Sequence, residues 1–423
     1  MKILVVGGGG REHAIIKKIK ENKEVKKIYA IPGNGGIAQD AECIAIPANE
    51  IEKITEKAVE LGIDFAVVAP DDPLVLGAVD SLNEKGIKTF GPNKAAAIIE
   101  GSKVFSKNLM KKYNIPTAQY EVFDDMEKAL SYLETAPIPT VIKADGLALG
   151  KGVIIAMTRD EAKAAVKSMM EDKIFGASGN NIVIEEFLEG PEVSVLSFTD
   201  GKTVVPMISS MDHKRAMDND EGLNTGGMGT IAPNPYYTDE IAKECMDKIF
   251  IPTIEAMNSE GRSFSGCLYF GLMLTKNGPK VIEYNCRFGD PETQVVLPLL
   301  KSDLLTIMQA TKSGMLDQVD VEFEDKCACC VIVASDGYPL SYEKGYEITI
   351  PAEIKPHVYV AGAKIANGKL VNNGGRVLGV VGKGETLKDA IDTAYARTRQ
   401  VHFKNAYYRR DIGKRALQAG REE

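Results

Sequence analysis

Three polar side chains alternate along the segment VIEYNCRFGDPETQ, which runs from Val281 to Gln294. Glu283, Asn285 and Arg287 occupy every second position, and side chains two apart on a strand point to the same face of a sheet. A carboxylate, an amide oxygen and a fixed cation in one row suit a hard metal ion that carries phosphate groups. The row therefore predicts a magnesium–phosphate site, in which Arg287 could stabilise charge on a transferring phosphoryl group. A surface strand with polar alternation is the alternative.

A glycine-rich turn, GGGGREH, extends from Gly7 to His13 between a predicted strand and a predicted helix. Glycines at such a junction let backbone N–H groups approach an anion at the helix N-terminus. The dinucleotide pattern G-x-G-x-x-G fails, because its third glycine would be Glu12 or His13, and the second strand ends without an acidic residue for a ribose. We expect a phosphate of a smaller substrate here, with Arg11 as a cation. A turn that binds nothing is the alternative.

A second glycine-rich turn, ADGLALGKGV, covers residues 144–153 between two predicted strands. It is not a P-loop, because Asp145 occupies the first glycine position and no Ser or Thr follows Lys151. Flexible glycines can still bring N–H donors close to a phosphate chain. Lys143, directly before the turn, could reach a phosphate as a point charge, and a solvated lysine is the alternative.

Two polar connectors follow the second turn. IVIEEFLEGPEVSV, residues 182–195, could present backbone groups to the edge of a flat base and a carboxylate to ribose hydroxyls, or it could be a charged linker. DHKRAMDNDEGLNTGGMGTIAPNP, residues 212–235, is long, polar and rich in glycine. Loops of this length in compact domains are usually functional or disordered. Asp212 offers a carboxylate for an amine or a water.

The elements that must position these residues alternate between strand and helix over residues 1–101, which predicts a parallel sheet with helices on both faces. A larger mixed domain at 102–325 contains a compact lid at about 120–190, where two strands flank the second glycine turn. Residues 326–423 are rich in strands, predicted at CCVIVAS, YEITI, HVYVAGAKI and RVLGVVGKG, with one helix. The predicted fold class is α/β with mixed α+β parts.

The bulk properties narrow the class of protein. The 423-residue chain has a net charge of −8, which argues against a nucleic-acid partner. No apolar run approaches the roughly 18 residues of a membrane span, and MKILVVGGGG has too short an apolar run for a signal peptide. Seven cysteines are an odd number, and CACC leads into a predicted buried strand, so we expect reduced thiols and a cytoplasmic protein.

As a set, nine segments resemble the glycinamide ribonucleotide synthetase family of ATP-grasp ligases. They extend from Gly7 to Gly413 and read GGGGREHA, PGNGG, GSKVFSK, KADGLALGKGV, EEFLEGPEVSV, DHKRAMDNDEGLNTGGMG, GPKVIEYNCRFGDPETQ, NGGRVLGV and YYRRDIG. The resemblance implies an ATP-grasp fold between the parallel-sheet domain and the strand-rich domain. It also implies ATP, Mg²⁺ or Mn²⁺, and a monomer that acts on small molecules.

The reaction implied by this resemblance belongs to purine biosynthesis. ATP would phosphorylate the carboxylate of glycine, and the amine of 5-phosphoribosylamine would attack the glycyl phosphate to give glycinamide ribonucleotide. Phosphorylation is needed because a carboxylate is a poor electrophile at neutral pH. Positioning and charge neutralisation should then dominate the protein's contribution.

The resemblance further implies which residues bind each ligand, motif by motif. Those expected at ATP are Lys103, Lys143, Glu185, Glu186, Leu188 and Glu192. Those expected at the metal are Glu283 and Asn285. Those expected near glycine are Asp212, Gly227 and Met228, and those near phosphoribosylamine are Gly9, Gly10, Arg11, Asn34, Asp290 and Glu292. Catalytic roles are expected for Arg287, Asp212 and Lys143.

Three alternative functions are weighed against this one. Another ATP-grasp carboxylate–amine ligase is the nearest, and DHKRAMDNDEGLNTGGMG and RFGDPETQ favour the glycine ligase over it. A catalytically silent nucleotide-binding subunit would not need the intact set of Lys143, Glu283, Asn285 and Arg287. An NAD oxidoreductase is disfavoured by the failed glycine fingerprint.

The predicted strand CLYFGLMLT carries no acidic residue that could bind a metal ion, which weakens the case for a second metal ion in the site.

Overall fold

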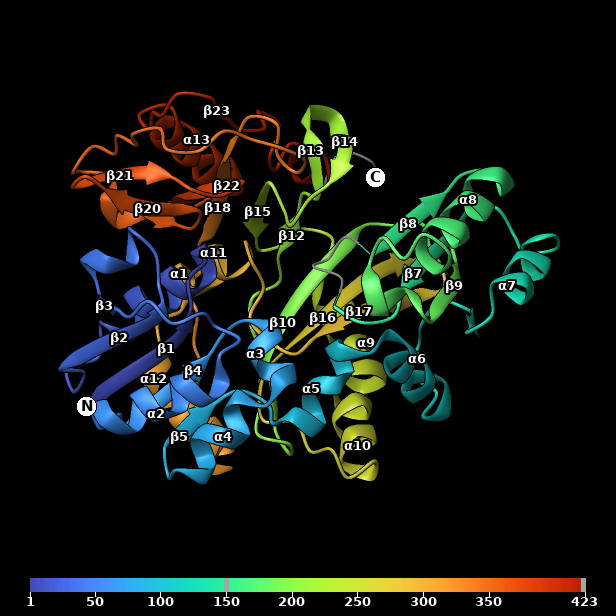
Figure 1. The fold of residues 1–423 in the computed structure, drawn as a ribbon, viewed down its shortest axis with the longest axis horizontal. Helices are drawn as coiled ribbons and strands as arrows, with labels where there is room; N and C mark the ends of the chain where they lie inside the picture. The colour runs from blue at the N-terminus through green and yellow to red at the C-terminus, as the bar shows by residue number, and fades with distance from the viewer. Residues whose placement is uncertain (148–151, 420–423) are drawn as a thin grey trace.

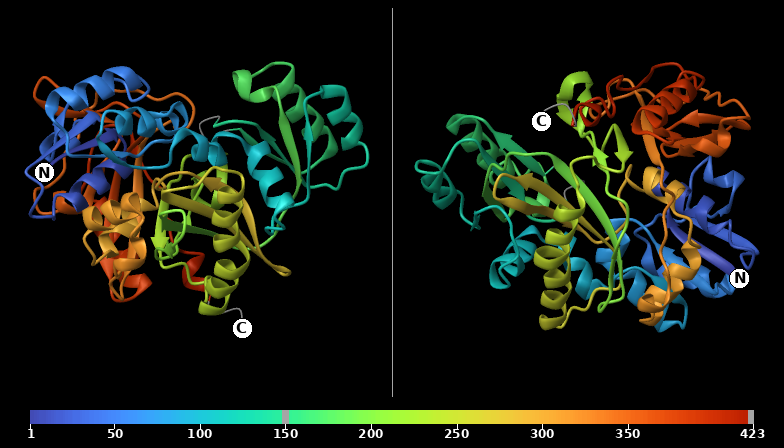
Figure 2. Two further views of the ribbon diagram at one scale, coloured as in Figure 1. Left: turned by 90° about the horizontal axis from the view of Figure 1, so that it is seen from below. Right: turned by 180° about the vertical axis from the view of Figure 1, so that it is seen from behind.

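The computed structural model describes residues 1–147 and 152–419 (Figure 1). In Figure 1 the N-terminal sheet lies at the lower left, the C-terminal sheet above it, and the lid projects to the right. The two further views in Figure 2 show the same separation of the lid from the rest of the molecule. The predicted α/β class with mixed parts is confirmed.

The N-terminal part is a five-stranded parallel sheet in the order β3-β2-β1-β4-β5. Ile3 and Val5 pack with α1 on one face, and Leu4 and Val6 pack with α2 and α4 on the other, as expected for a parallel sheet buried on both faces. The strands are β1 (Lys2–Gly7), β2 (Lys27–Pro32), β3 (Glu42–Cys43), β4 (Phe65–Val68) and β5 (Lys88–Phe90). The helices are α1 (Gly10–Ile19), η1 (Ile37–Gln39), α2 (Ile51–Leu61), α3 (Asp71–Leu76), α4 (Ala78–Glu84) and α5 (Lys94–Gly101).

The lid is a four-stranded antiparallel sheet with its own small core. Its order is β6-β9-β7-β8, and alanine, leucine, valine and methionine side chains of α7 and α8 cover the sheet. Helix α6 (Lys103–Lys112) leads into β6 (Tyr120–Phe123), α7 (Met126–Leu133), β7 (Thr140–Ala144), β8 (Val153–Ala156), α8 (Arg159–Met170), η3 (Gly176–Gly179) and β9 (Ile182–Glu186). The middle of the predicted glycine turn, 148–151, lies outside the described residues.

The central sheet is antiparallel and has the order β11-β10-β16-β17. Its strands are β10 (Glu192–Thr199), β11 (Val204–Pro206), β16 (Gly266–Thr275) and β17 (Gly278–Asn285). The helical segment beside it consists of α9 (Asp239–Cys245), a π-helical turn η5 (Met246–Phe250) and α10 (Ile251–Ser259). Pro252 stands in the first turn of α10, where its missing N–H interrupts the regular helical ladder.

The C-terminal sheet recruits strands from the long polar connector. β12 (Met211–Asp212) and β15 (Gly229–Ala232) pair into the order β12-β15-β18-β22-β19, and β23 pairs with β18. This sheet therefore crosses the predicted boundary between 325 and 326. Its other strands are β18 (Cys327–Ser335), β19 (Val358–Val360), β22 (Arg376–Gly384) and β23 (Ala406–Tyr407), and α13 (Leu387–Thr398) packs on β18 and β22.

Two hairpins and several short helices complete the chain. One hairpin is β13 (Arg215–Met217) with β14 (Glu221–Asn224), and the other is β20 (Ala363–Ala366) with β21 (Lys369–Asn372). The short helices are η4 (Asp218–Asp220), α11 (Thr293–Val296), η6 (Leu297–Leu299), α12 (Leu304–Ser313), η7 (Leu316–Gln318), η8 (Lys355–His357) and η9 (Ala416–Gln418).

Two strand predictions in the C-terminal part are wrong in detail. YEITI forms no strand, because its alternate residues bridge different partners, Glu347 to Val371 and Thr349 to His402, so that no continuous ladder develops. HVYVAGAKI is two strands, β19 and β20, in different sheets. CACC does open a strand, β18, and all seven cysteines, each within the described part of the chain, are free.

A membrane-spanning helix and a cluster of potential metal ligands are both absent from the described part of the chain. Over residues 1–147 and 152–419, none of the helices is both long enough and apolar enough to span a membrane. The same part of the chain contains no group of three or more His, Cys, Asp or Glu side chains placed to hold a metal ion.

Candidate active site

Two lysines and a glutamate converge where the lid meets the central sheet. Lys143, on β7, donates from Nζ to the carbonyl oxygen of Ile282 at 3.1 Å, directly beside Glu283 on β17. Lys103, the first residue of α6, donates to the carbonyl oxygen of Gly146. Burial alone would raise the pKa of Glu283, but the charges of Lys214, Lys143 and Lys103 more than offset it and hold that pKa at about 2. Glu283 is therefore an ionised carboxylate surrounded by cations.

A buried carboxylate lies beside these residues. Glu185 on β9 is 4% exposed, and its Oε2 is 3.1 Å from both Lys107 and Lys143. Its Oε1 has no hydrogen-bond partner within the described residues. Burial lowers the pKa of Lys107 to about 8, although Glu185 opposes the shift. We call Lys103, Lys107, Lys143, Glu185 and Glu283 the lysine–glutamate cluster.

The other residues predicted at the nucleotide surround this cluster less closely. Glu186 pairs with Lys280 at 2.8 Å and accepts the N–H of Gln119 at 3.1 Å. Leu188 is half-buried in the connector between β9 and β10, and Glu192, which opens β10, is exposed. Glu192 lies 3.9 Å from Lys214, and the same lysine lies 3.6 Å from Glu283. Lys214 is therefore the residue that links Glu192 to Glu283.

The opening row of three residues is only partly a strand. Glu283 and Asn285 share one face of β17, whereas Arg287 lies beyond its end. The Arg287 side chain nevertheless returns to the row, since Nη2 donates to Asn285 Oδ1 at 3.0 Å and pairs with Glu100 at 3.0 Å. Glu100 also accepts the N–H of Cys286 at 2.7 Å. Glu100 at the end of α5 thus fixes Arg287 beside the two oxygen donors.

A second group of residues lies around Asp212 on β12. Burial and the neighbouring charge of Glu292 raise the pKa of Asp212 well above its ordinary value. Glu292 is 4% exposed and accepts the hydroxyl of Tyr269 at 3.2 Å. Gly227 packs against Asp212 with φ +115°, and a Cβ there would lie 2.6 Å from Asp212 Oδ1. Only glycine fits this position, while the adjacent Met228 N–H is taken by the carbonyl of His213 at 2.8 Å.

Arg376 at the start of β22 connects this group to the C-terminal sheet. Its Nη1 donates to the carbonyl oxygens of Gly226 and Asp290, both at 2.7 Å, and its Nη2 is 3.5 Å from Asp290 Oδ2. Burial would raise the pKa of Asp290, but Arg376 and Arg11 more than offset it and lower that pKa. We call Asp212, Gly227, Asp290, Glu292 and Arg376 the loop cluster.

The glycine-rich turn before α1 uses its polar groups within the protein. Gly9 donates its N–H to Glu12, and Arg11 donates to Glu12 and, at 3.1 Å, to the carbonyl of Phe288. Asn34 donates to the carbonyls of Gly8 and Val360 at 2.9 and 2.7 Å, and its Oδ1 accepts two further backbone N–H groups. The side chains of Arg11 and Asn34 therefore shape the turn. A Cβ at Gly10 would lie 2.7 Å from Gln294 Nε2, so this helix start packs tightly on α11.

The two clusters adjoin each other. Lys214, two residues after Asp212, lies 3.6 Å from Glu283 and is 40% exposed. The charge of Glu283 raises the pKa of Lys214 well above its ordinary value, against the effect of burial, so it remains an ammonium. A ligand that contacts the lysine–glutamate cluster and one that contacts the loop cluster would therefore meet near Lys214 and Arg287.

Models of one family match almost the entire chain. Those of phosphoribosylglycinamide synthetase match residues 1–100 as the N domain, 101–293 as the ATP-grasp (A) domain and 328–415 as the C domain. The chain belongs to the phosphoribosylglycinamide synthetase family. The predicted family, the ATP-grasp fold and an ATP-dependent ligase are thereby confirmed.

Individual relatives agree with this family. The phosphoribosylamine–glycine ligase of Caldanaerobacter subterraneus subsp. tengcongensis is 50% identical over 413 residues, covering 97% of this chain and 99% of its own. The crystal structure of phosphoribosylamine–glycine ligase from Thermotoga maritima superposes with a TM-score of 0.87 at 35% identity, covering 97% and 100%. A biotin carboxylase domain from Hydrogenobacter thermophilus, in complex with MgADP, has a TM-score of 0.74 at 16% identity, covering 99% and 93%, and shares the fold alone.

The family implies a divalent metal, and the residues fit one. Glu283 is ionised and Asn285 offers an amide oxygen, and these are hard donors of the kind that Mg²⁺ and Mn²⁺ prefer. The amide oxygen has two lone pairs, so it can accept Arg287 and still face a cation. Two protein donors suit an ion that takes its remaining ligands from phosphate and water.

Sequence reasoning missed four members or supports of this synthetase site. Lys107 is one helical turn beyond Lys103 in GSKVFSK, and that i, i+4 spacing could have found it. Arg376 stands in NGGRVLGV, which is one of the segments that carry the family resemblance, but no role was predicted for this arginine. Glu100 and Lys214 had no distinguishing local pattern, since each matters only through partners far along the chain.

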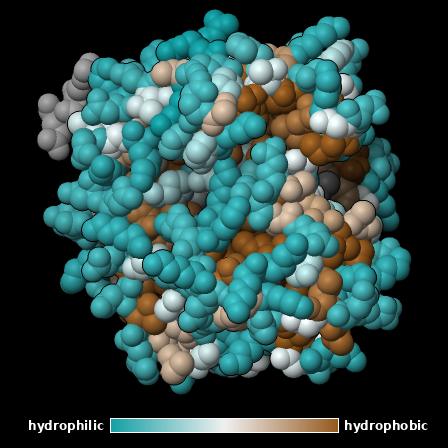
Figure 3. Space-filling view, turned by 90° about the vertical axis from the view of Figure 1, so that its left-hand side faces the viewer, coloured by the Kyte–Doolittle hydropathy of each residue, from teal (hydrophilic) through white to brown (hydrophobic). Residues whose placement is uncertain are grey.

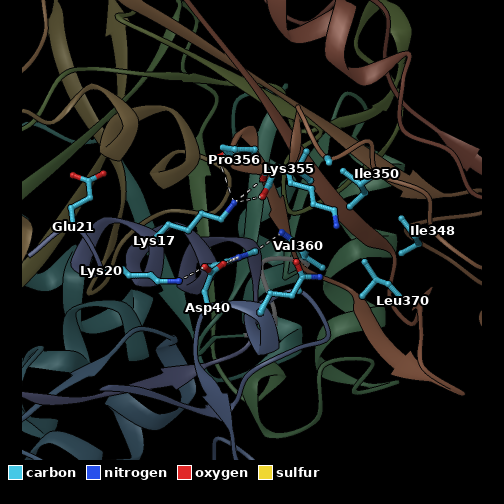
Figure 4. Close-up of a pocket in the computed structure, with 15 residues that line it drawn as sticks. Lys17, Lys20, Glu21, Asp40, Ile348, Ile350, Lys355, Pro356, Val360 and Leu370 are labelled. Carbon is cyan, nitrogen blue, oxygen red and sulfur yellow. Dashed lines mark hydrogen bonds and ion pairs between the residues drawn. The ribbon is translucent and has the colours of Figure 1, made fainter. Parts of the chain in front are cut away.

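A further hollow of the molecule lies away from both clusters. It measures about 640 Å³ and lies between α1 and the C-terminal part, on the side where Figure 3 shows apolar patches among hydrophilic residues. In Figure 4, Lys20 points toward Asp40 and Lys17 points toward the backbone of Lys355 and Pro356, while Glu21 stands apart. Lys17 donates to the carbonyl of Val358 at 2.8 Å, and Asp40 accepts from Lys20 at 2.9 Å and from His13 at 3.0 Å. These groups join the N-terminal helix to the C-terminal part and belong to neither cluster.

Proposed function

We propose that this synthetase-family protein ligates glycine to 5-phosphoribosylamine at the expense of ATP, through a glycyl phosphate intermediate, giving glycinamide ribonucleotide, ADP and phosphate. The observation that carries the proposal is the meeting of the two clusters at Lys214, 3.6 Å from Glu283 and two residues from Asp212. One cluster has the charges for a nucleoside triphosphate, and the other has paired carboxylates for an amine. Relatives named phosphoribosylamine–glycine ligase at 45–50% identity support the assignment.

The lysine–glutamate cluster would bind ATP. Lys103 and Lys143 would contact the phosphates, and Glu185, Glu186 and Leu188 would line the adenine edge, with Glu192 at the ribose. A magnesium or manganese ion on Glu283 and Asn285 would neutralise charge on the phosphoryl group. Arg287, held by Glu100, would stabilise the acyl phosphate as its charge develops.

The loop cluster would bind glycine and the amine that attacks it. Asp212 and the backbone of Gly227 and Met228 would hold glycine, and Asp290 and Glu292 would face the phosphoribosylamine beside Gly9, Gly10, Arg11 and Asn34. Asp212 Oδ1 already accepts the His213 N–H at 2.7 Å. Its raised pKa brings Oδ2 closer to the pH range in which a carboxylate can take a proton from the attacking amine.

The lid at about 120–190 would close over ATP and keep water from the acyl phosphate, which hydrolysis would otherwise destroy. Its separate core supports a unit that can move as a body. The division into domains at 1–101, 102–325 and 326–423 remains our proposal, as do a monomer, a cytoplasmic location and the absence of a nucleic-acid partner. Light scattering of the purified protein would test the monomer.

The deciding assay is ADP release with candidate acids and amines. We expect release only when ATP, a divalent metal, glycine and phosphoribosylamine are present together, with glycinamide ribonucleotide formed in equal amount. Replacing glycine by alanine or aspartate tests the alternative of another carboxylate–amine ligase. Faster ADP release with another acid, or release without any amine acceptor, would contradict the proposal.

A further inference from the structure

The segment YYRRDIG near the C-terminus has no role in the function proposed above. It lies against the β13–β14 hairpin, which stands at the top of the view in Figure 1. Its third residue, Arg409, is only 2% exposed, and it is the largest of the fully buried side chains in the described part of the chain. A buried guanidinium is costly unless it is paired and hydrogen-bonded, so its partners indicate what it holds.

Arg409 binds the hairpin through its guanidinium. Its Nη1 donates to Asp220 Oδ1 at 2.9 Å and to the carbonyl of Arg215 at 3.0 Å. Its Nε and Nη2 form a bidentate pair with Asp411 at 2.8 and 2.9 Å. Bidentate pairs fix geometry as well as charge. Asp411 thus orients the guanidinium, and the remaining nitrogen contacts Asp220 in the hairpin turn and the carbonyl of Arg215 at the start of β13.

Backbone groups of the same segment reinforce this contact. Arg410 donates its N–H to Asp218 at 2.7 Å, and Asp411 accepts the N–H of Asn219 at 2.8 Å. Asn219 and Asp220 have φ values of 60° and 55°, the left-handed conformation that a tight hairpin turn requires. Non-glycine residues adopt it at a cost, and contacts from outside must stabilise it.

The hairpin buries only one of its apolar side chains, Ala216 at 2% exposure. An isolated two-stranded hairpin is marginally stable in water, and the apolar side chains Met217 and Leu223 are 52% and 50% exposed rather than buried. Yet the hairpin connects Asp212 with Gly227, the two ends of the loop that touch each other in the loop cluster. A shift of the hairpin would therefore move the proposed glycine site.

We propose that Arg409 is a positioning residue for glycine, which acts through Asp220 and the Arg215 carbonyl to fix the hairpin between Asp212 and Gly227. The inference rests on the proposed function, in which those two residues bind glycine. The residues proposed at the ATP phosphates stand on α6, β7 and β17, and none of the contacts of Arg409 reaches them. Arg409 should consequently set the KM for glycine and leave the KM for ATP unchanged.

The test compares steady-state kinetics of Arg409→Gln, Arg409→Lys and Asp220→Asn with the wild type. We expect Arg409→Gln to raise the KM for glycine about tenfold or more, with the KM for ATP within about twofold. Arg409→Lys should recover part of the effect, since lysine keeps the charge and loses the bidentate geometry. Asp220→Asn removes the charge of the hairpin carboxylate and so weakens its contact with Arg409, leaves the Arg409–Asp411 pair intact, and should raise the KM for glycine in the same direction.

Arg415→Gln is the matched control. Arg415 pairs with the same Asp220 at 3.5 Å but is 52% exposed, so its loss should change either KM by less than about twofold. If Arg409→Gln does not fold, Asp220→Asn decides. An unchanged KM for glycine in Asp220→Asn, or a parallel rise in the KM for ATP, would overturn the inference while leaving the proposed function intact. Wild-type ADP release that is independent of glycine would instead overturn both.

Discussion

The lysine–glutamate cluster and the loop cluster are built in different ways. The first uses side chains on regular elements: Lys143 on β7, Glu185 on β9 and Glu283 on β17, with the lysines of α6 opposite. The second uses the end of a two-residue strand, a glycine in a loop and an arginine from the C-terminal sheet. Regular elements fix a side chain through their own repeat, whereas a loop must be fixed by contacts from elsewhere. We therefore expect substitutions in the lysine–glutamate cluster to act by removing a charge or a ligand. Substitutions around the loop cluster should act by displacing the loop.

The largest effect should come from Glu283→Ala. Removing this carboxylate leaves Lys103, Lys143 and Lys214 without their shared anion and removes a proposed metal donor. We expect ATP turnover to fall about a thousandfold, the scale of losing a strong electrostatic contributor, while the protein still folds. ADP release measures the first and thermal unfolding the second. Glu255→Ala, an exposed site on α10, is the control, and near-normal turnover in Glu283→Ala would refute the metal role.

Asp212→Asn should affect the other cluster and spare ATP. Asparagine keeps the shape and can still accept the His213 N–H, but it cannot take a proton from an amine. We expect kcat/KM for glycine to fall about a hundredfold, in the range of general-base catalysis, with the KM for ATP within about twofold. Initial rates at varied glycine and ATP measure both quantities. Asp247→Asn, exposed on η5, serves as the control.

A change in glycine kinetics alone in Asp212→Asn would support two clusters that act independently. A simultaneous rise in the KM for ATP would mean that the clusters are not independent, despite their separate elements. In that case Lys214, which lies between them, would be the residue through which the effect passes.

The same difference explains how much could be predicted from the sequence. The parallel N-terminal sheet followed from alternating strands and helices, and the spacing of Glu283 and Asn285 placed both on one face of β17. Local periodicity decides such features. The pairing of Arg376 with Gly226, which are 150 residues apart, obeys no local rule. It depends on how β22 packs against the 212–235 connector.

Residue type alone does not show which contacts a side chain makes within the protein. Arg11 and Asn34 were expected to contact phosphoribosylamine, and that role is still a prediction. Their hydrogen bonds to Phe288, Gly8 and Val360 give both of them a structural role in the turn. The prediction of a strand at YEITI was wrong for a related reason. Alternation of polar and apolar residues does not show whether a single partner strand lies beside the segment.

A smaller effect is expected from Lys107→Met on α6. Methionine keeps the length of the side chain and removes its charge, so that Glu185 is left with Lys143 alone. We expect the KM for ATP to rise about tenfold, equal to about 1.4 kcal/mol of binding, with the KM for glycine unchanged. Lys111→Met, exposed on the same helix, is the control. A change in glycine kinetics of similar size would contradict the separation of the clusters.

The smallest effect concerns His213, which ties the loop to the C-terminal segment. Its Nδ1 lies 3.1 Å from the carbonyl of Gly229, and its Nε2 accepts the N–H of Gly413 at 3.1 Å, so the ring is neutral in the folded protein. Burial, together with the charges of Arg409 and Arg415, lowers the pKa of His213 to about 4, while Asp220 opposes the shift. The ordinary value is 6.5.

The pH dependence of stability follows from that difference. Between pH 6.5 and 4 the unfolded chain binds a proton at His213 that the folded chain does not bind, so the free energy of unfolding falls as the pH falls through this window. The slope is about 1.4 kcal/mol per pH unit, or about 2 kcal/mol between pH 6.5 and 5. Urea unfolding at several pH values should therefore show a steeper loss in the wild type than in His213→Gln. His402→Gln, at an exposed histidine, should keep the wild-type slope. Equal slopes in the wild type and His213→Gln would mean that this histidine does not hold the loop cluster to the C-terminal segment in the way the geometry requires.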